Sequence, residues 1–210
     1  LGALGPLDRL GEGSVLVHID PKTCLADRYK FPETGSFGHT PLLALNGDVW
    51  VTMINRNALA HWERATDKVS YYLDPVPDAL PYGLDIDHQG KVWFGEYFGG
   101  AITRFDPETK TFKRFKVQTF PNNLRRLGAD SKNNMWFATW GNIGKNGFLG
   151  RISATTGDMV EFTIPIEYSH PYDVQPDPED NIWVAQDNYL AKFDQKTLGF
   201  TIYPVPERTD

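Results

Sequence analysis

Short alternating runs of apolar and polar residues fill the chain, and a tryptophan marks the same place in each of four similar segments. These tryptophans are 43, 43 and 47 residues apart: Trp50, Trp93, Trp136 and Trp183. Each one follows a turn and belongs to an alternating run such as VWFGE. A spacing of two between apolar residues predicts β-strands, and the frequent Pro and Gly residues argue against helices.

One repeat holds four short strands. In the clearest copy we predict strands at 82–87, 92–97, 101–105 and 111–117. Four antiparallel strands in every ~40–45 residues are typical of a β-propeller blade. The sequence therefore predicts an all-β fold, a β-propeller of four-stranded antiparallel blades with about 43 residues in each.

The repeats predict a single propeller domain or a fragment of one. A partial blade covers 1–37, and full blades cover about 38–80, 81–123, 124–170 and 171–206. Propellers close with about four to eight blades. Because the repeats begin inside one blade and stop between two, we expect that this chain alone does not close into a complete ring. Further blades or a partner chain would then cover the open strand edges.

Composition excludes several classes of protein. The net charge of −6 argues against a general nucleic-acid binder, which needs a basic surface to displace counterions. No apolar run approaches the ~20 residues that a transmembrane helix needs. The single cysteine, Cys24, excludes an internal disulfide framework and a cysteine-rich zinc site.

A longer motif accompanies the second tryptophan. The segment reads PYGLDIDHQGKVWFGEYFGGAITRFDPETKTFKRFKV, and weaker copies of it run from about Val15 to Pro206. It resembles the repeat of the virginiamycin B lyase (streptogramin lyase) family of propellers. The resemblance implies membership of a seven-bladed propeller, a bound Mg²⁺ and the opening of a cyclic lactone by elimination. It also implies a bacterial protein in the periplasm or outside the cell.

Function is expected where the repeats differ at equivalent places, because equivalent loops of all blades meet around one end of the channel. Alignment on the tryptophans gives two such columns. The first holds His39, Tyr82, Arg125 and Tyr172, and the second holds Met53, Glu96, Thr139 and Gln186. These unlike residues predict a mixed polar site on the funnel face. The tryptophans themselves are expected to be core residues between blades.

The resemblance carries over the family's catalytic residues only in part. The glutamate of the family's W-F-T-E segment is matched by Glu96 alone, and the family's histidine after a proline falls on Tyr82 and Tyr172. His39 occupies that column but follows Gly38. An elimination needs a general base and a group that stabilises developing negative charge. His39 is the candidate catalytic base and Glu96 the candidate metal ligand, with a solvated or ion-paired Glu96 at the channel mouth as the alternative.

A cationic and aromatic mouth is predicted on the same face. Arg125 and Arg126 can grip a carboxylate or a phosphate, or they can pair with Glu96 from the preceding blade. The other candidate ligand-binding residues are Tyr82, Tyr97, Trp140, Tyr172 and Gln186. For the aromatic residues among them, ordinary packing is the alternative role.

Two classes of function remain open. We favour a module that binds a small-molecule ligand or a partner protein on its funnel face without catalysis, because most of the family's histidine–glutamate set is missing. The alternative is a metal-dependent lyase, or a lactonase-like hydrolase, with Mg²⁺ or Ca²⁺ in the funnel. A third interpretation is a structural subunit of a larger assembly.

Overall fold

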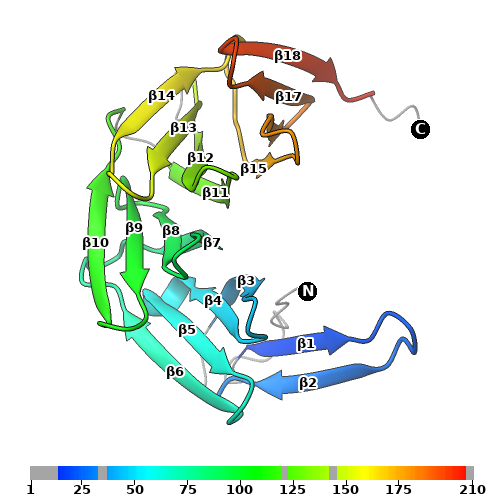
Figure 1. Ribbon diagram of the computed structural model, residues 1–210, viewed down its shortest axis with the longest axis vertical. Helices are drawn as coiled ribbons and strands as arrows, with labels where there is room; N and C mark the ends of the chain where they lie inside the picture. The colour runs from blue at the N-terminus through cyan, green and yellow to red at the C-terminus, as the bar shows by residue number, and fades with distance from the viewer. Residues whose placement is uncertain (1–13, 33–36, 120–122, 142–145, 207–210) are drawn as a thin grey trace.

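The computed structural model describes residues 14–32, 37–119, 123–141 and 146–206. Its strands form one two-stranded sheet and four four-stranded antiparallel sheets, which follow one another in chain order. These sheets stand side by side along an open arc, with the first strand of each four-stranded sheet at the concave edge (Figure 1). The predicted propeller architecture of four-stranded antiparallel blades is confirmed.

We call the four-stranded sheets blades 1 to 4. The two-stranded sheet contains β1 (Val15–Ile19) and β2 (Ala26–Lys30). Blade 1 contains β3 (Gly38–Leu43), β4 (Val49–Met53), the short 3₁₀ helix η1 (Ile54–Arg56), β5 (Ala58–Glu63) and β6 (Lys68–Leu73). Blade 2 contains β7 (Pro81–Ile86), β8 (Val92–Glu96), β9 (Ala101–Asp106) and β10 (Thr111–Lys116). Blade 3 contains β11 (Asn123–Ala129), β12 (Asn134–Trp140), β13 (Phe148–Ser153) and β14 (Met159–Thr163). Blade 4 contains β15 (Asp173–Pro176), β16 (Ile182–Gln186), β17 (Tyr189–Asp194) and β18 (Gly199–Pro204).

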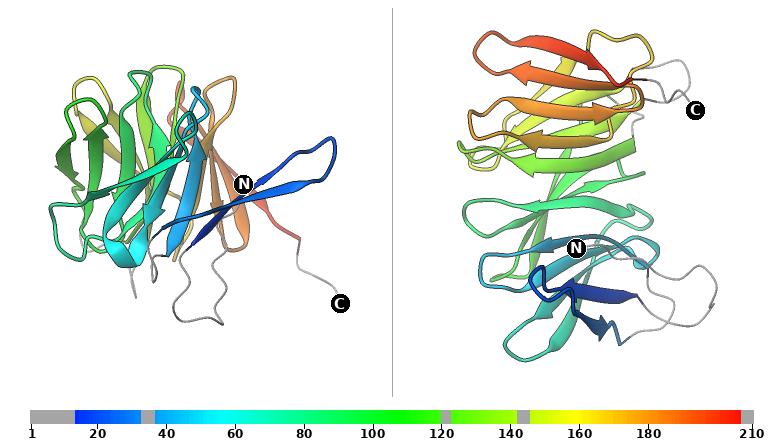
Figure 2. Two further views of the ribbon diagram at one scale, coloured as in Figure 1. Left: turned by 90° about the horizontal axis from the view of Figure 1, so that it is seen from below. Right: turned by 90° about the vertical axis from the view of Figure 1, so that its right-hand side faces the viewer.

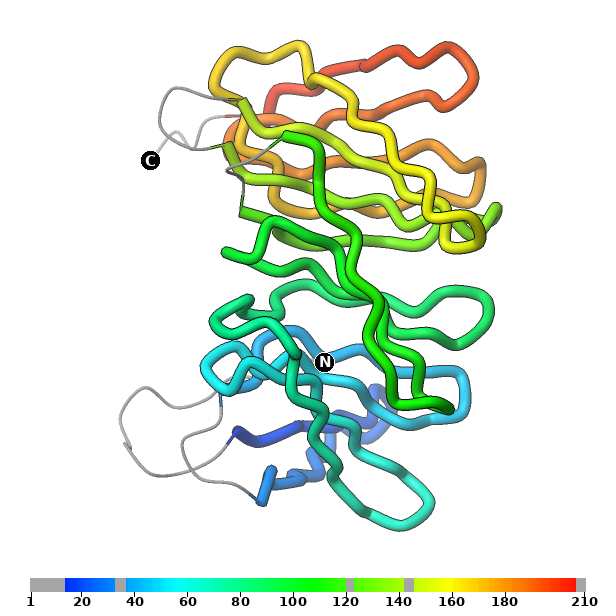
Figure 3. Tube along the Cα trace, turned by 90° about the vertical axis from the view of Figure 1, so that its left-hand side faces the viewer, coloured from blue at the N-terminus to red at the C-terminus, as the bar shows by residue number. Residues whose placement is uncertain are grey.

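The strands predicted for the clearest repeat agree with β7 to β10 to within one residue at each end. The predicted partial blade at 1–37 lies partly outside the described residues, and its described part contains β1 and β2. The described strands do not form a closed ring, because the two-stranded sheet and blade 4 stand at the two ends of the arc (Figures 1 and 2). Seen from its outer side, the molecule is a stack of meandering sheets (Figure 3).

The hydrophobic core lies between neighbouring blades. The tryptophans of the first three blades are buried at these junctions: Trp50, Trp93 and Trp136. Trp93 of blade 2, for example, packs on Leu124 of blade 3. Trp183 of blade 4 is only partly buried, since no described sheet covers its face of that blade.

An aspartate six residues earlier fixes the tryptophan in three of the blades. The indole N–H groups of Trp93, Trp136 and Trp183 donate to Asp87, Asp130 and Asp177 at 2.7, 2.8 and 2.9 Å. The same carboxylates accept backbone N–H groups of the β-turn that follows them. Each aspartate therefore joins the turn between the first two strands to the core.

A β-bulge interrupts the innermost strand of each of the first three blades. The pairing register shifts between Gly38 and Pro41, between Pro81 and Leu84, and between Leu124 and Leu127. Bulges re-aim side chains and are frequent beside functional sites. The residues within these three bulges include His39, Tyr82 and Arg125.

Candidate functional site

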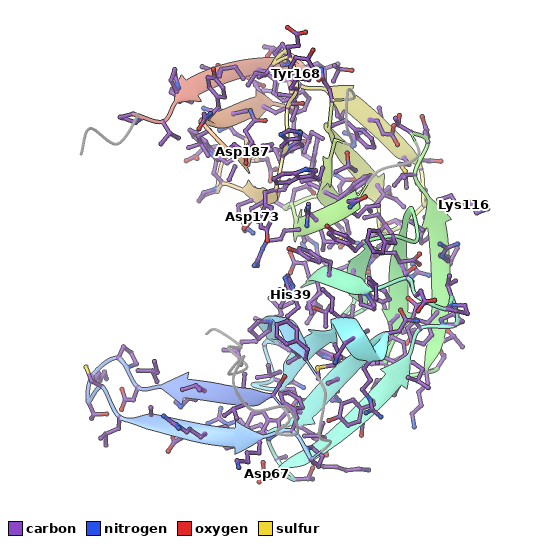
Figure 4. All side chains as sticks on the ribbon, turned by 180° about the vertical axis from the view of Figure 1, so that it is seen from behind. His39, Asp67, Lys116, Tyr168, Asp173 and Asp187 are labelled. Atoms are coloured by element: carbon purple, nitrogen blue, oxygen red, sulfur yellow. The ribbon has the colours of Figure 1, made fainter. Side chains whose placement is uncertain are left out.

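The first variable column comes together at the concave edge. The rings of His39 and Tyr82 lie 3.9 Å apart, although they belong to different blades. The Tyr82 hydroxyl forms a 2.6 Å hydrogen bond with the hydroxyl of Tyr172, which precedes β15 of blade 4. Figure 4 shows His39 on the concave side of the arc together with Asp173, whereas Asp67 and Lys116 lie on the outer side.

Arg125 is the centre of this group. Its guanidinium carbon lies within 4.5 to 5.3 Å of four ring centroids, those of Tyr82, Tyr97, Trp140 and Tyr172. We call these five residues the Arg125 cluster. A guanidinium over an aromatic face at such distances is held by cation–π attraction, which is worth roughly 0.5–2 kcal/mol for each ring.

Close approach of the strands at this place depends on Gly83. A Cβ atom at that position would lie 2.5 Å from the Arg126 Cα and 2.6 Å from the Arg125 backbone oxygen. The missing side chain therefore lets β7 lie directly against the bulge of β11. This contact brings Tyr82 within reach of Arg125.

Strand alternation explains how the second strands contribute to the cluster. Trp93 faces blade 3, so Tyr97, four residues later, is directed the same way and meets Arg125 of that blade. Trp140, four residues after Trp136, is directed toward blade 4 and contacts Tyr172 there at a centroid distance of 6.0 Å. Both rings therefore close the cluster from the sides.

The cluster is positively charged. Among the described residues no carboxylate forms an ion pair with Arg125, and its Nε atom is buried without a hydrogen-bond partner. The neighbouring Arg126 is only loosely paired, with 3.8 Å between its Nε and Asp173 Oδ2. The arrangement leaves one uncompensated guanidinium at the concave edge.

This charge and the surrounding burial affect two titratable groups. Burial, and then the charges of Arg126 and Arg125, lower the pKa of His39, against a backbone hydrogen bond at Tyr82. His39 is therefore neutral at pH 7. Burial and the hydrogen bond with Tyr172 raise the pKa of Tyr82 to about 12, so its hydroxyl keeps its proton.

The second column does not join this group. Glu96 is three residues after Trp93 and therefore faces blade 1 instead of blade 3. Its fully buried carboxylate accepts hydrogen bonds from Arg114 Nε at 2.7 and 2.9 Å, from Arg114 Nη2 at 2.5 Å and from Thr103 Oγ1 at 2.5 Å. The ion-pair partner of Glu96 is thus Arg114 on β10, rather than Arg125 or Arg126.

A second carboxylate lies beside this pair. Asp74 follows β6 of blade 1, is 7% exposed, and has one oxygen, Oδ2, buried without a partner. Burial, and then the charge of Glu96, raise its pKa to about 6, although the Val76 N–H and Arg114 act in the opposite direction. Sequence reasoning missed both Asp74 and Arg114, since neither lies in a column aligned on the tryptophans.

Gln186 is the second-column residue of blade 4. Both polar atoms of its side-chain amide are buried without partners. It borders a pocket of about 140 Å³ that is also lined by Ser169, His170 and Asp187. His170 stacks on Trp140 at 4.9 Å and lies 3.2 Å from Asp187, so it extends the concave edge. Its position directly before Pro171 at a repeat start was the only sequence signal for it.

The Mg²⁺ that the family resemblance implies does not fit the described residues. Both oxygens of the Glu96 carboxylate are occupied by Arg114, whose positive charge opposes a cation at the same place. No group of three or more His, Cys, Asp and Glu side chains in the described part of the chain could hold a metal ion. We therefore derive no chemical step through a metal.

Solved structures of lyases share the fold. Virginiamycin B lyase from Staphylococcus aureus superimposes with a TM-score of 0.82 at 20% identity, over 99% of this chain and 73% of that one. A catalytically inactive histidine-to-alanine variant of the Staphylococcus aureus enzyme, solved with quinupristin, gives 0.81 at 21% identity over 98% and 73%. Identities this low establish the fold alone.

Other relatives are more distant or match only in part. The extracellular domain of a hybrid two-component system from Bacteroides thetaiotaomicron gives a TM-score of 0.69 at 18% identity, over 90% of this chain and 26% of that one. A pentonolactonase from Haloferax volcanii is 27% identical over 84 residues, which are 40% of this chain and 28% of that enzyme. The described residues contain no helix of the length and apolarity that a membrane crossing requires.

The family assignment rests on a longer match. Residues 17–192 match the Virginiamycin B lyase family, and this range includes blades 1 to 3, blade 4 as far as Lys192, and every residue of the Arg125 cluster. The blade repeat and the superposition on lyase structures agree with that match. The chain belongs to the virginiamycin B lyase family.

Proposed function

We propose that this chain is a binding module whose concave edge holds a small-molecule ligand at the Arg125 cluster, without catalysis. The observation that carries the proposal is a guanidinium surrounded by four rings, for which the described residues provide no carboxylate partner. A ligand carbonyl or carboxylate would accept from Arg125, and an apolar ring of the ligand would stack on the aromatic side chains.

Catalysis is the second candidate function. It is supported by the family match and by His39, which is neutral at pH 7 and lies against Tyr82 at the same edge. A neutral imidazole can accept a proton, as an elimination or a hydrolysis requires. Against it, Glu96 is neutralised by Arg114 and is not directed into the cluster.

Binding can be tested with two probes taken from the relatives, quinupristin and a pentono-1,4-lactone, in isothermal titration calorimetry. We expect saturable binding of at least one probe, weakened tenfold or more by Arg125→Met. The matched control is Arg151→Met, because Arg151 also lies over a tryptophan, Trp136, but in the core between blades. If neither probe binds, or if both variants bind equally well, the proposed ligand site is wrong.

The same samples distinguish binding from catalysis by mass spectrometry. Hydrolysis of a lactone adds one water to its mass, and elimination opens the ring at constant mass but changes its retention on a column. We expect both probes to be recovered unchanged. Ring opening that disappears in His39→Ala would establish the catalytic alternative.

We also propose a location and a partner, by extension from the relatives. Relatives with this fold include extracellular domains, and we extend that to an exported, periplasmic or extracellular location for this chain. A partner protein at the concave edge, within a larger assembly, is the other occupant that the Arg125 cluster would suit. Fractionation of a tagged full-length protein tests the location.

A further inference from the structure

A second concave surface lies at the other end of the innermost strands. A groove of about 650 Å³ runs between blades 1 and 2, beside the turns that follow β3 and β7. Its apolar lining comes from Leu42, Leu43, Ala44, Leu45, Ile86 and Pro107. Leu43 and Leu45 are largely exposed, which is unusual for leucines that stand together.

The groove lies where blade 1 lacks an aspartate that the other three blades have. In blades 2 to 4 an aspartate six residues before the tryptophan accepts the indole N–H, but in blade 1 this position is Ala44. Trp50 occupies the usual place, since it packs on Phe105 at 5.7 Å as Trp136 packs on Phe193 at 5.6 Å. Within the described residues the Trp50 indole N–H has no hydrogen-bond partner, and its nitrogen remains in contact with solvent.

The groove also lies where a turn residue cannot form the side-chain hydrogen bond that joins neighbouring blades at the other junctions. At the next junctions, Asn133 accepts the His88 backbone N–H at 2.8 Å, and Asp180 accepts that of Ser131 at 3.1 Å. The equivalent turn residue of blade 2 is Gly90, which has the same left-handed backbone but no side chain. A Cβ atom at Gly90 would meet no atom within 4 Å. The junction between blades 1 and 2 therefore stays open.

The carboxylates near the groove restrict the charge of a ligand. Asp48 is held by His61 and the Arg64 N–H, Asp87 by Trp93, and Asp85 by the Ala129 N–H. All three carboxylates accept hydrogen bonds from within the protein and offer no donor to a ligand. Although burial acts against them, hydrogen bonds from the Arg64 N–H and His61 lower the pKa of Asp48, so its negative charge repels an anion. The Trp50 N–H is a free donor at the floor of the groove, and an uncharged acceptor can satisfy it.

We propose that this groove binds a neutral, apolar small molecule through a carbonyl oxygen that accepts the Trp50 indole N–H. The carbonyl would take the role that an aspartate carboxylate has in the other three blades. The volume of the groove is within the range of small-molecule sites, roughly 300–1,000 Å³. The proposal is independent of the Arg125 cluster, which lies at the opposite end of β3 and β7.

Three probes of similar shape test the chemistry: benzophenone, which has a carbonyl, diphenylmethane, which lacks it, and 4-benzoylbenzoate, which adds a negative charge. The readout is the indole N–H signal of Trp50 in ¹H–¹⁵N spectra of the full chain, identified with Trp50→Phe. We expect a saturable downfield shift with benzophenone. Diphenylmethane and 4-benzoylbenzoate should bind at least tenfold more weakly.

Two variants place internal groups where the ligand would bind. Ala44→Asp restores the aspartate, so the Trp50 signal should move in the free protein and benzophenone should bind at least tenfold more weakly. Gly90→Asn supplies a side chain that can accept the Leu45 backbone N–H, as Asn133 accepts that of His88. This variant should bind benzophenone more weakly, and the Trp50 signal of its free form should not move. Both residues are those that other blades already have at these positions, so folding is expected.

The matched control is Asn133→Gly, which opens the next junction while Asp87 still holds the Trp93 N–H. The Trp93 signal of this variant should not respond to benzophenone. The proposal is overturned if the Trp50 signal of the parent does not move, if diphenylmethane binds as tightly as benzophenone, or if Ala44→Asp binds like the parent.

Discussion

Two charged residues near the concave edge are stabilised in different ways. Glu96 is fully buried, and Arg114 donates hydrogen bonds to both of its carboxylate oxygens. A Cβ atom at Gly99 would lie 1.9 Å from Glu96 Oε2, so the glycine makes room for this pair. Arg125 is surrounded by rings, which attract a cation but leave hydrogen-bonding capacity. The first residue is thus structural, and the second suits ligand binding.

The raised pKa of Asp74 gives a prediction about pH. Its carboxyl has a pKa of about 6 in the folded protein, against roughly 4 in an unfolded chain. Between these values the folded state binds more protons than the unfolded state, so this group lowers the free energy of unfolding as the pH rises from 4 to 6. Asp74→Asn removes the effect and can still accept the Val76 N–H. We expect the variant to gain stability relative to the parent as the pH is raised from 4.5 to 7.5.

Urea unfolding of both proteins at the two pH values measures this difference, because all other titrating groups are shared. Asp78→Asn is a suitable control, since Asp78 is an exposed residue of the same linker. A stability difference between Asp74→Asn and the parent that is constant with pH would show that the pKa of Asp74 is the same in the folded and unfolded protein.

At the scale of the strand, much of the fold follows from the sequence, because the repeat and its alternation directly reflect the two faces of each sheet. The bulges do not show in that pattern, yet they direct His39, Tyr82 and Arg125 to one edge. Alignment of the repeats on their tryptophans identified these three residues, because unlike side chains occupy the same position in successive repeats. The same alignment predicted Glu96 at the same end of the channel. Glu96 is three residues after Trp93, and this odd number directs its side chain to the opposite face of the sheet.

The partners of these residues are harder to predict. Arg114 meets Glu96 through the pairing of β9 with β10, and Asp74 meets it across a blade junction. Both contacts depend on how strands from separate parts of the chain are placed together. A single sequence contains no signal for such a contact beyond the charge of the residues.

The aspartate that fixes each tryptophan gives a prediction at the same scale. Asp130 is 1% exposed and accepts the Trp136 and Asn134 donors. Asp130→Ala leaves these donors without a partner in the core, which should cost on the order of 3 kcal/mol. Although burial acts against it, hydrogen bonding to Trp136 and Asn134 lowers the pKa of Asp130. Its stabilisation is therefore present above pH ~4 and is lost as the pH falls below that value.

The comparison variant is Asp177→Ala in blade 4. Asp177 accepts the same kinds of donor, but its partner Trp183 is only partly buried, so water can replace the lost carboxylate. Thermal and urea unfolding at pH 7 should show a clearly smaller loss for this variant. Equal losses would mean that the turn, rather than burial of the tryptophan, determines the effect.

At the scale of the whole molecule, the blades differ in how many neighbours they have. Blades 1 to 3 have a described sheet on each side, whereas blade 4 has one neighbour, and the two-stranded sheet has one. Stability in such an array is approximately a sum of intrinsic terms and nearest-neighbour contacts. The ends of the arc should therefore open more easily than its middle.

Hydrogen exchange of the full chain tests this gradient. Amides of β8 and β12, which lie between two packed faces, should exchange slowest and report opening of the whole array. Amides of β16 should exchange faster, because one face of blade 4 has no described sheet against it. Those of β1 and β2 should exchange fastest, since a two-stranded sheet is marginally stable and depends on its contact with blade 1 through Leu16 and Phe31. Equal protection of β12 and β16 would contradict the gradient and would show that blade 4 is covered on both faces in solution.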